Sequence, residues 1–230
     1  MPPDRLARIL EEFVADGDAG WSMSRLCDVT RDVAGVSGAG IMLMSGDVQR
    51  GSLCTTNDVS YLIEELQYTL GEGPCVDAYQ HNRVVLEPDL AQPSAPRWLA
   101  FTPQAVAAGV RALYAFPLQV GTVRLGALDL YRDQASSLTD DQHADAMVMA
   151  EVIARWVLDV QAQAPPGVVA EELEHDADFH FVVHNAAGVV SVQLGVSITE
   201  ALIRLRAYAF SEDRSLRAVA EDVVARKLRF

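Results

Sequence analysis

The sequence predicts an α+β domain followed by an all-α helical bundle. Before residue 162 the hydrophobic pattern changes repeatedly between strand and helix spacing, and after the break it is helical throughout. The break is the segment Ala162–Gly167, whose two prolines and glycine cannot continue a helix. We therefore expect one domain over residues 1–163, a linker over 164–170 and a second domain over 171–230.

The first domain is expected to begin with two helices and a hairpin. Apolar residues recur at helical spacing over residues 6–13, and again over 26–36 behind a capping residue at Ser22. Two strand-like runs follow at 40–44 and 49–54. Turn residues between these runs predict that the two strands pair.

The rest of the first domain alternates helices and strands. Thr139 and Gln142 have the spacing of a capping box, which predicts a long final helix ending near Val160. Strands in hairpins flanked by helices favour an antiparallel sheet. The elements expected before that helix are helix 59–68, helix 76–81, strand 84–86, helix 100–108, strand 112–120 and strand 123–131.

Three short amphipathic helices are predicted after the linker. The first covers residues 181–194 and ends at Gly195, because glycine favours the left-handed conformation of a helix C-terminus. The second begins at the capping-box residue Ser197 and carries an apolar stripe to Ala209, and the third covers residues 216–224. Helices with such stripes and short links form a small bundle.

The charge of the chain limits its partners. There are 32 acidic against 18 basic side chains, for a net charge of −14 and a pI near 4.6, so the molecule as a whole repels phosphates. Residues 179–230 differ, with seven basic against five acidic side chains. Any contact with nucleic acid is therefore expected at a local patch in this segment.

The expected location is the cytoplasm. The N-terminus lacks a signal-peptide pattern, and no apolar run approaches the ~20 residues that span a bilayer. We therefore expect no membrane contact. Three cysteines are no disulfide framework, so we also expect reduced thiols.

Five fragments in order carry a family resemblance in the first domain. Together they resemble a GAF domain of the actinobacterial type over roughly residues 5–160. The resemblance implies a sensor domain with an antiparallel sheet flanked by helices. The fragments are Gly71–Cys75, Val84–Leu90, Arg97–Trp98, Gly109–Leu118 and Arg124–Tyr131.

The last third of the chain resembles an ANTAR domain, the three-helix RNA-binding module of transcription antiterminators. With the GAF-like part, the chain is similar to GAF and ANTAR domain-containing antitermination regulators of actinobacterial type. Such proteins bind paired RNA hairpins near a terminator, without covalent chemistry, so we expect no enzyme and no cofactor. The matching residues are Ala186, Gly188, Leu194, Gly195, Ser197, Glu200, Ala201, Leu205, Arg206, Ala209, Arg214, Leu216, Val219, Ala220, Val223 and Val224.

One part of the ANTAR pattern is missing. The family has Arg, Glu, Gln and Lys where this chain has His180, His184, Asn185 and Ala187, so two basic groups are absent. The alternative is a sensor and dimerisation scaffold whose degenerate ANTAR domain no longer binds RNA.

Arginines and histidines of the tail are the candidate RNA contacts. Arginine suits phosphate, and protonated histidine strengthens RNA binding at lower pH. The alternative is that these side chains only solvate helix faces. The spacing of the two histidines also permits a metal, but the glutamate of a zinc-protease helix is absent, and we predict no metal site. The candidates are His180, His184, Arg204, Arg206, Arg214 and Arg217.

A small-molecule pocket is the second candidate site. The GAF resemblance implies a ligand between the sheet and the loops over it. Aromatic side chains are the candidate lining, with ordinary core packing as the alternative. They are Trp98, Phe101, Tyr114, Phe116 and Tyr131.

Two cysteines form a redox candidate. Cys54 ends a strand, and Cys75 precedes a helix whose start can stabilise a thiolate. A thiol sensor or reductase is therefore a further alternative, against small buried side chains. The acidic pair Glu64–Glu65 is expected to be a solvated helix face.

A homodimer is the expected assembly. The helix that begins at Thr139 carries Val148, Val152 and Trp156 at four-residue spacing. A two-fold contact between helices is a common way to bury such a stripe.

Overall fold

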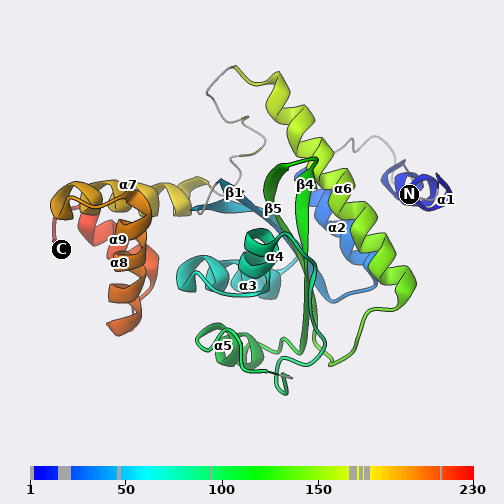
Figure 1. The fold of residues 1–230 in the computed structure, drawn as a ribbon, viewed down its shortest axis with the longest axis horizontal. Helices are drawn as coiled ribbons and strands as arrows, with labels where there is room; N and C mark the ends of the chain where they lie inside the picture. The colour runs from blue at the N-terminus through cyan, green and yellow to red at the C-terminus, as the bar shows by residue number, and fades with distance from the viewer. Residues whose placement is uncertain are drawn as a thin grey trace.

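The computed structural model describes residues 3–14, 22–45, 48–93, 95–165, 170, 173, 177–212 and 214–230. Its helices and strands follow the predicted order (Figure 1). They are α1 (Pro3–Val14), α2 (Met23–Ala34), β1 (Gly38–Ser45), β2 (Val48–Thr55), α3 (Asp58–Leu70), α4 (Pro74–His81), β3 (Val85–Glu87), α5 (Phe101–Ala107), β4 (Ala112–Val120), β5 (Val123–Arg132), α6 (Asp140–Gln163), α7 (Ala177–Leu194), α8 (Ile198–Ser211) and α9 (Leu216–Val224).

The strands form one sheet in the order β2-β1-β5-β4-β3. All of its pairings are antiparallel, which confirms the predicted antiparallel sheet. β4 and β5 are joined at Gly121, and Val120 pairs with Val123 across the turn. The central strand β5 pairs with β1 on one side and with β4 on the other. The middle of the sheet therefore joins segments that are far apart in the sequence.

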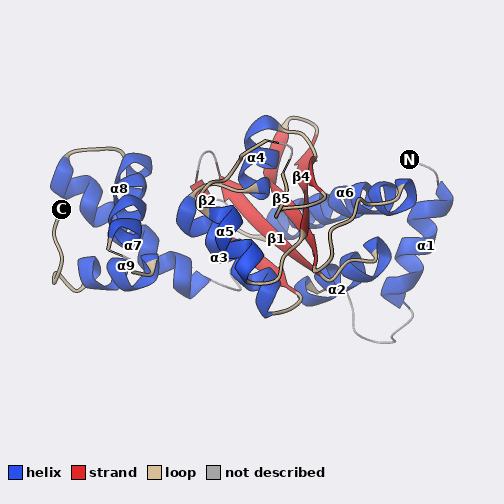
Figure 2. Ribbon diagram, turned by 90° about the horizontal axis from the view of Figure 1, so that it is seen from below, coloured by secondary structure: helices blue, strands red, loops and turns tan. Residues whose placement is uncertain are grey.

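Helices cover both faces of the sheet (Figure 2). Leu128 and Leu130 of β5 pack with α1, α2 and α6, whereas Ala127 and Tyr131 pack with α3, α4 and α5. Successive side chains of a strand point to opposite faces. Asp129 therefore points toward the α3–α5 face.

Predicted caps fix three helix starts. The hydroxyl of Ser22 accepts a hydrogen bond from the Arg25 amide. Thr139 and Gln142 form the reciprocal capping box of α6. The Ser197 hydroxyl accepts from the Glu200 amide and caps α8. These bonds satisfy amides that have no partner within the helix.

The three C-terminal helices pack on one another beside the sheet domain. They lie at the end of the molecule opposite α1 (Figure 1). Leu205 and Val219 are fully buried between them. The apolar core of the α3–α5 face continues into this bundle, and α7 contacts β2. The two parts of the chain are therefore in physical contact.

The predicted dimer stripe on α6 is used within the chain. Val148 is buried, and Val152 and Trp156 pack against the core of the α1–α2–α6 face. The stripe covers the molecule's own sheet and needs no second copy. The homodimer stays a prediction, without support from this stripe.

No single helix in the described ranges is long and apolar enough to cross a membrane. The helical segments Val182–Leu194 and Ile198–Ser211 together have the length and apolar composition of a membrane span, but they are bent by 105° relative to each other.

Candidate functional site

A polar cluster lies inside the domain, between the sheet and helices α3 and α4. Glu64 comes from α3, Cys75 from the first turn of α4 and Asp129 from the middle of β5. All three are buried, and one ligand-type atom from each lies within 4.8 Å of the others. The fold therefore gathers two carboxyl groups and a thiol in its apolar interior.

Gln67 holds two members of this cluster in place. It lies on α3, about one turn after Glu64. Its side-chain amide donates to Oδ2 of Asp129, and its Oε1 accepts from the backbone N–H of Cys75 at 2.7 Å. One buried side chain thus links the strand to the start of α4.

The carboxyl oxygens of the cluster are poorly partnered. Neither oxygen of Glu64 has a hydrogen-bond partner in the described part of the chain, and the same is true of Oδ1 of Asp129. Burial followed by the Asp129 charge raises the pKa of Glu64 well above its ordinary value. Burial raises the pKa of Asp129 to about 7, against the lowering effect of Gln67 and Cys75.

The environment of Cys75 opposes a thiolate. Burial, followed by the charges of Asp129 and Glu64, raises the pKa of its thiol well above the ordinary value. The expectation that the helix start stabilises a thiolate here is wrong, because burial beside two acidic groups outweighs the helix terminus.

Small residues make room for the cluster. Asp129 pairs with Gly40 on one side and with Ala115 on the other. A Cβ added to Gly40 would lie 2.4 Å from Oε1 of Glu64, so the Glu64 carboxyl rests directly on the backbone of β1. Glycine at position 40 therefore allows this carboxyl to enter the interior.

The sequence reading missed this site. Glu64 was expected on a solvated helix face, but it is only 2% exposed. The sequence held one signal, because Glu64 adjoins the apolar residue Ile63 and Asp129 lies between Leu128 and Leu130. In the structure these three apolar neighbours are buried. The separation of the three residues along the chain hid their proximity.

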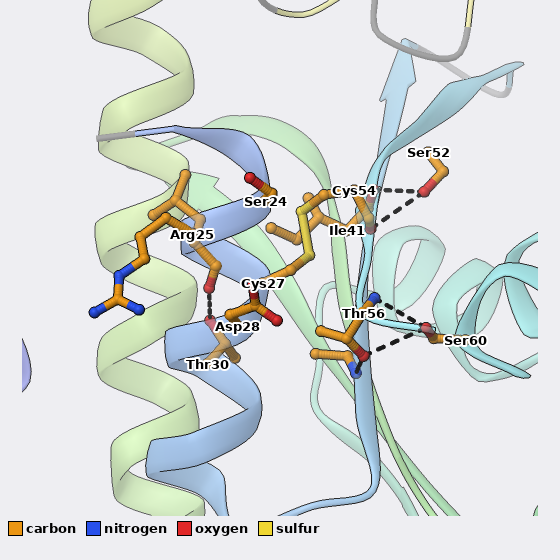
Figure 3. Close-up of a disulfide and its surroundings, with 12 residues drawn as sticks. Ser24, Arg25, Cys27, Asp28, Thr30, Ile41, Ser52, Cys54, Thr56 and Ser60 are labelled. Atoms are coloured by element: carbon orange, nitrogen blue, oxygen red, sulfur yellow. Dashed lines mark hydrogen bonds between the residues drawn. A yellow bond between two sulfur atoms is a disulfide. The ribbon is translucent and has the colours of Figure 1, made fainter. Parts of the chain in front are cut away.

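The disulfide is the main correction to the cysteine predictions. Cys27 of α2 is bonded to Cys54 of β2, and Figure 3 shows the bond crossing from the helix to the strand. The expectation of reduced thiols is wrong for this pair, and Cys75 is the free cysteine of the described residues. Cys54 and Cys75 lie in the cores of opposite faces of the sheet. They do not form one redox pair.

The five candidate pocket aromatics are separated by the sheet. Trp98, Phe101 and Tyr131 belong to the core of the α3–α5 face, whereas Tyr114 and Phe116 belong to the other core. They do not line one pocket. The reason is that residues 114 and 116 share one face of β4, while the side chain of Tyr131 points to the opposite face.

An open depression of about 320 Å³ lies between the β4–β5 turn and α6. Phe116, Val120 and Met147 contribute apolar surface to it, and Glu151 and Arg155 contribute charge. Phe116 is the one residue of the five predicted aromatics that lines this depression.

Three candidate RNA-binding arginines form ion pairs at the surface of the bundle. Arg204 pairs with Glu200 at 3.0 Å, and Arg217 pairs with Glu221 at 2.9 Å. Arg214 pairs with Asp222 at 2.6 Å and is exposed. His184 is half-buried on α7, and the side chain of His180 lies outside the described residues.

Arg206 lies at the contact between the bundle and the sheet domain. Its guanidinium carbon is 5.5 Å from the centre of the Tyr68 ring. It also lies beside Gly71, where an added Cβ would come within 3.0 Å of Nη1. Burial lowers the pKa of Arg206. The structure therefore gives this residue a docking contact.

Comparison with known families identifies the first domain. The family model of the GAF domain matches residues 23–155, which is more than half of the chain. The chain therefore belongs to the GAF domain family. A GAF domain is a signal-sensing regulatory domain, which confirms that part of the predicted resemblance.

Solved structures are similar to the chain in fold. The GAF domain of a phosphoenolpyruvate-protein phosphotransferase from Acinetobacter has 13% identity and a TM-score of 0.48, covering 71% of this chain and 96% of that chain. The corresponding domain from Coxiella burnetii has 10% identity and a TM-score of 0.49, covering 71% and 98%. A GAF domain/HD domain protein from Geobacter sulfurreducens has 13% identity and a TM-score of 0.47, covering 63% and 98%. No curated protein matches the sequence.

Proposed function

We propose that the chain is a cytoplasmic, signal-responsive regulator of transcription termination. In this proposal the GAF domain is the sensor, and helices α7–α9 bind RNA hairpins near terminators. The resemblance of the tail to ANTAR domains supports this function, and so does the excess of basic side chains over residues 179–230. Regulation comes from binding one RNA fold in preference to another and needs no covalent step.

The contact of Arg206 with the sheet domain is the observation that connects the GAF domain to the proposed RNA-binding helices. Arg206 is on α8, whereas Tyr68 and Gly71 end the helix that carries Glu64 and Gln67. A shift of α3 in response to a signal would act directly on α8. In this proposal α8 therefore responds to the interior of the GAF domain through its contact with the end of α3.

Arg204, Arg214 and Arg217 are the RNA contacts that we favour. Two of them form exposed pairs at i,i+4 spacing, and such surface pairs contribute about 0–1 kcal/mol. Replacing the carboxylate partner of such an arginine by an RNA phosphate therefore costs little free energy. Charge-assisted bonds to phosphate are stronger when they are bidentate, which arginine permits.

The test uses fluorescence anisotropy with the full chain and paired terminator hairpins at several salt concentrations. We expect Arg204→Ala and Arg217→Ala to weaken binding several-fold and to lower the salt slope by about one each. Arg155→Ala is the matched control, because Arg155 forms the same kind of exposed pair with Glu151 on α6. It should leave RNA binding unchanged.

The absence of binding by the unmodified chain at low salt would contradict the proposal. The same result would favour the alternative, a sensor and scaffold whose degenerate ANTAR-like tail no longer contacts RNA. An equal loss in the Arg155→Ala control would show that only the overall charge matters.

The disulfide supports a second candidate function, a thiol redox sensor. In a reducing compartment an oxidant would close the Cys27–Cys54 bond and fix α2 on β2. We expect peroxide to change RNA binding or protease sensitivity in the unmodified chain and not in Cys27→Ser. An identical peroxide response in both proteins would exclude this function.

A further inference from the structure

We propose that Glu64, Cys75 and Asp129 bind a divalent transition-metal ion of the Zn²⁺ or Fe²⁺ class inside the GAF domain. The proposal goes beyond RNA regulation and does not depend on it. Three observations support it: the convergence of three ligand atoms, the lack of a hydrogen bond to three of the four carboxyl oxygens among the described residues, and neighbouring residues that fix the ligands in place.

The donor atoms already lie close to the spacing that a metal needs. A carboxylate oxygen binds Zn²⁺ at roughly 2.0–2.2 Å and a thiolate sulfur at about 2.3 Å, so bound donors lie roughly 3–4 Å apart. The three atoms here are within 4.8 Å of one another. Changes in side-chain rotation of about an ångström bring them to bonding distance.

Three of the four carboxyl oxygens of Glu64 and Asp129 have no hydrogen-bond partner in the described part of the chain. Glu64 is 2% exposed, and neither of its oxygens accepts a hydrogen bond within the described ranges. Asp129 is 4% exposed, with Oδ2 held by Gln67 and Oδ1 without a hydrogen bond. None of the ion pairs formed by the described residues involves either group. Buried carboxylates ordinarily pair or coordinate metal, and a cation at this point supplies the missing partner.

The surroundings support a metal site. Gln67 orients Asp129 through its amide group and the start of α4 through the Cys75 amide, which is the role of an outer-shell residue at a metal centre. Gly40 leaves the space that the Glu64 carboxyl occupies. Each of the three proposed metal ligands therefore belongs to a helix or a strand, which holds its backbone in place.

The donor set selects the metal. Without a metal the buried Cys75 is a thiol, and a bound cation would displace its proton to give a thiolate ligand. A thiolate disfavours Mg²⁺ and Ca²⁺, which prefer oxygen ligands alone, and suits Zn²⁺ or Fe²⁺. Three protein ligands leave a fourth position of a tetrahedral site for water or a small ligand. A GAF domain with such a centre would sense either the metal or a small molecule that binds to it.

The test is a metal titration of the full chain, purified with chelator and kept non-reduced, so that Cys27 and Cys54 stay bonded. Calorimetry with Zn²⁺ should give one site per chain. Co²⁺ should produce thiolate-to-metal charge-transfer absorption in the near ultraviolet. We expect Cys75→Ser to abolish this absorption, and Glu64→Gln and Asp129→Asn each to weaken Zn²⁺ binding at least tenfold.

Glu151→Gln is the matched control, because it removes the same charge from the exposed surface of α6. It should bind Zn²⁺ like the unmodified chain. Circular dichroism melting of the metal-free proteins checks the fold, and the two isosteric carboxyl variants should melt no lower than the unmodified chain.

Two outcomes would overturn the proposal. One is the absence of Zn²⁺ binding by the folded, unmodified chain. The other is equal binding by the unmodified chain and all three site variants, which would place the ion on other residues. If one variant fails to fold, the remaining two decide the result.

Discussion

The contact between Gly40 and Glu64 shows how one residue shapes the interior. The Glu64 carboxyl lies where a side chain at position 40 would begin. Asp129, the strand neighbour of Gly40, is buried beside it. The absence of a Cβ at one position of β1 therefore decides whether the Glu64 carboxyl fits between α3 and the sheet.

Gly40→Ala should destabilise the protein by about 1–3 kcal/mol, because the new Cβ forces Glu64 out of its position. In a Glu64→Ala background the same change should cost much less. Urea unfolding of the four proteins gives the coupling free energy of the pair. An equal cost in both backgrounds would show that another neighbour of Gly40 is responsible.

Single-residue roles were the hardest to predict from the sequence. Glu64 lies next to Glu65, and such a pair is typical of a solvated helix face. Its burial depends on β1 and β5, whose pairing with each other no local pattern reveals. For the same reason Cys27 and Cys54 were not expected to meet, since their bond joins a helix to a strand across 27 residues.

At the scale of elements, the Cys27–Cys54 bond fastens α2 to β2, near the edge of the sheet. The N-terminal helices also hold to this face through apolar packing and, for α1, through ion pairs of Arg5 and Arg8 with Asp145 of α6. The bond closes a loop that the unfolded chain would leave open, so it restricts the unfolded state.

Cys27→Ser should lower the free energy of unfolding by about 3 kcal/mol. Dithiothreitol should lower the stability of the unmodified chain by a similar amount and should not affect the variant. Cys75→Ser serves as the control, since its stability should still respond to reductant. Insensitivity of the unmodified chain to reductant would contradict the prediction.

The helix caps give a second prediction at this scale. Ser197→Ala removes the acceptor for the Glu200 amide and should cost about 1 kcal/mol. The loss should appear as faster hydrogen exchange in α8. Thr139→Ala should act in the same way on α6 and leave α8 unchanged. Equal exchange in α8 of the unmodified and Ser197→Ala chains would show that the cap contributes nothing.

Elements were the most predictable level of the structure. Ser22, Thr139 and Ser197 mark helix starts chemically, and a side-chain oxygen is needed at such places whatever the tertiary fold. The apolar runs over residues 112–120 and 123–131, with a turn at Gly121 and Thr122 between them, identified both strands and their hairpin. The order of strands in the sheet could not be read in this way, because the pairing of β1 with β5 depends on distant segments.

At the scale of the whole molecule, the bundle and the sheet domain share one apolar core and one half-buried arginine, Arg206. Arg206 docks on Tyr68, whereas Arg204 of the same helix is exposed and pairs with Glu200. Two arginines two residues apart therefore have different roles, one at the contact between domains and one at the surface.

Arg206→Ala should loosen the bundle from the sheet domain. We expect a larger radius of gyration in small-angle X-ray scattering and faster proteolysis between α6 and α7. Arg204→Ala should change neither, because it leaves the contact intact. Identical scattering from both variants would show that apolar packing alone holds the two parts together.

The place of β5 in the sheet also sets the timing of folding during synthesis. β1 leaves the ribosome early, yet its inner edge bonds to β5, which ends at Arg132. Until that strand emerges, the first hairpin has no partner on that edge, and long-range pairings of this kind close slowly. The nascent chain must therefore carry an open strand edge while residues 56–122 are synthesised, a period in which it is exposed to aggregation or to a chaperone.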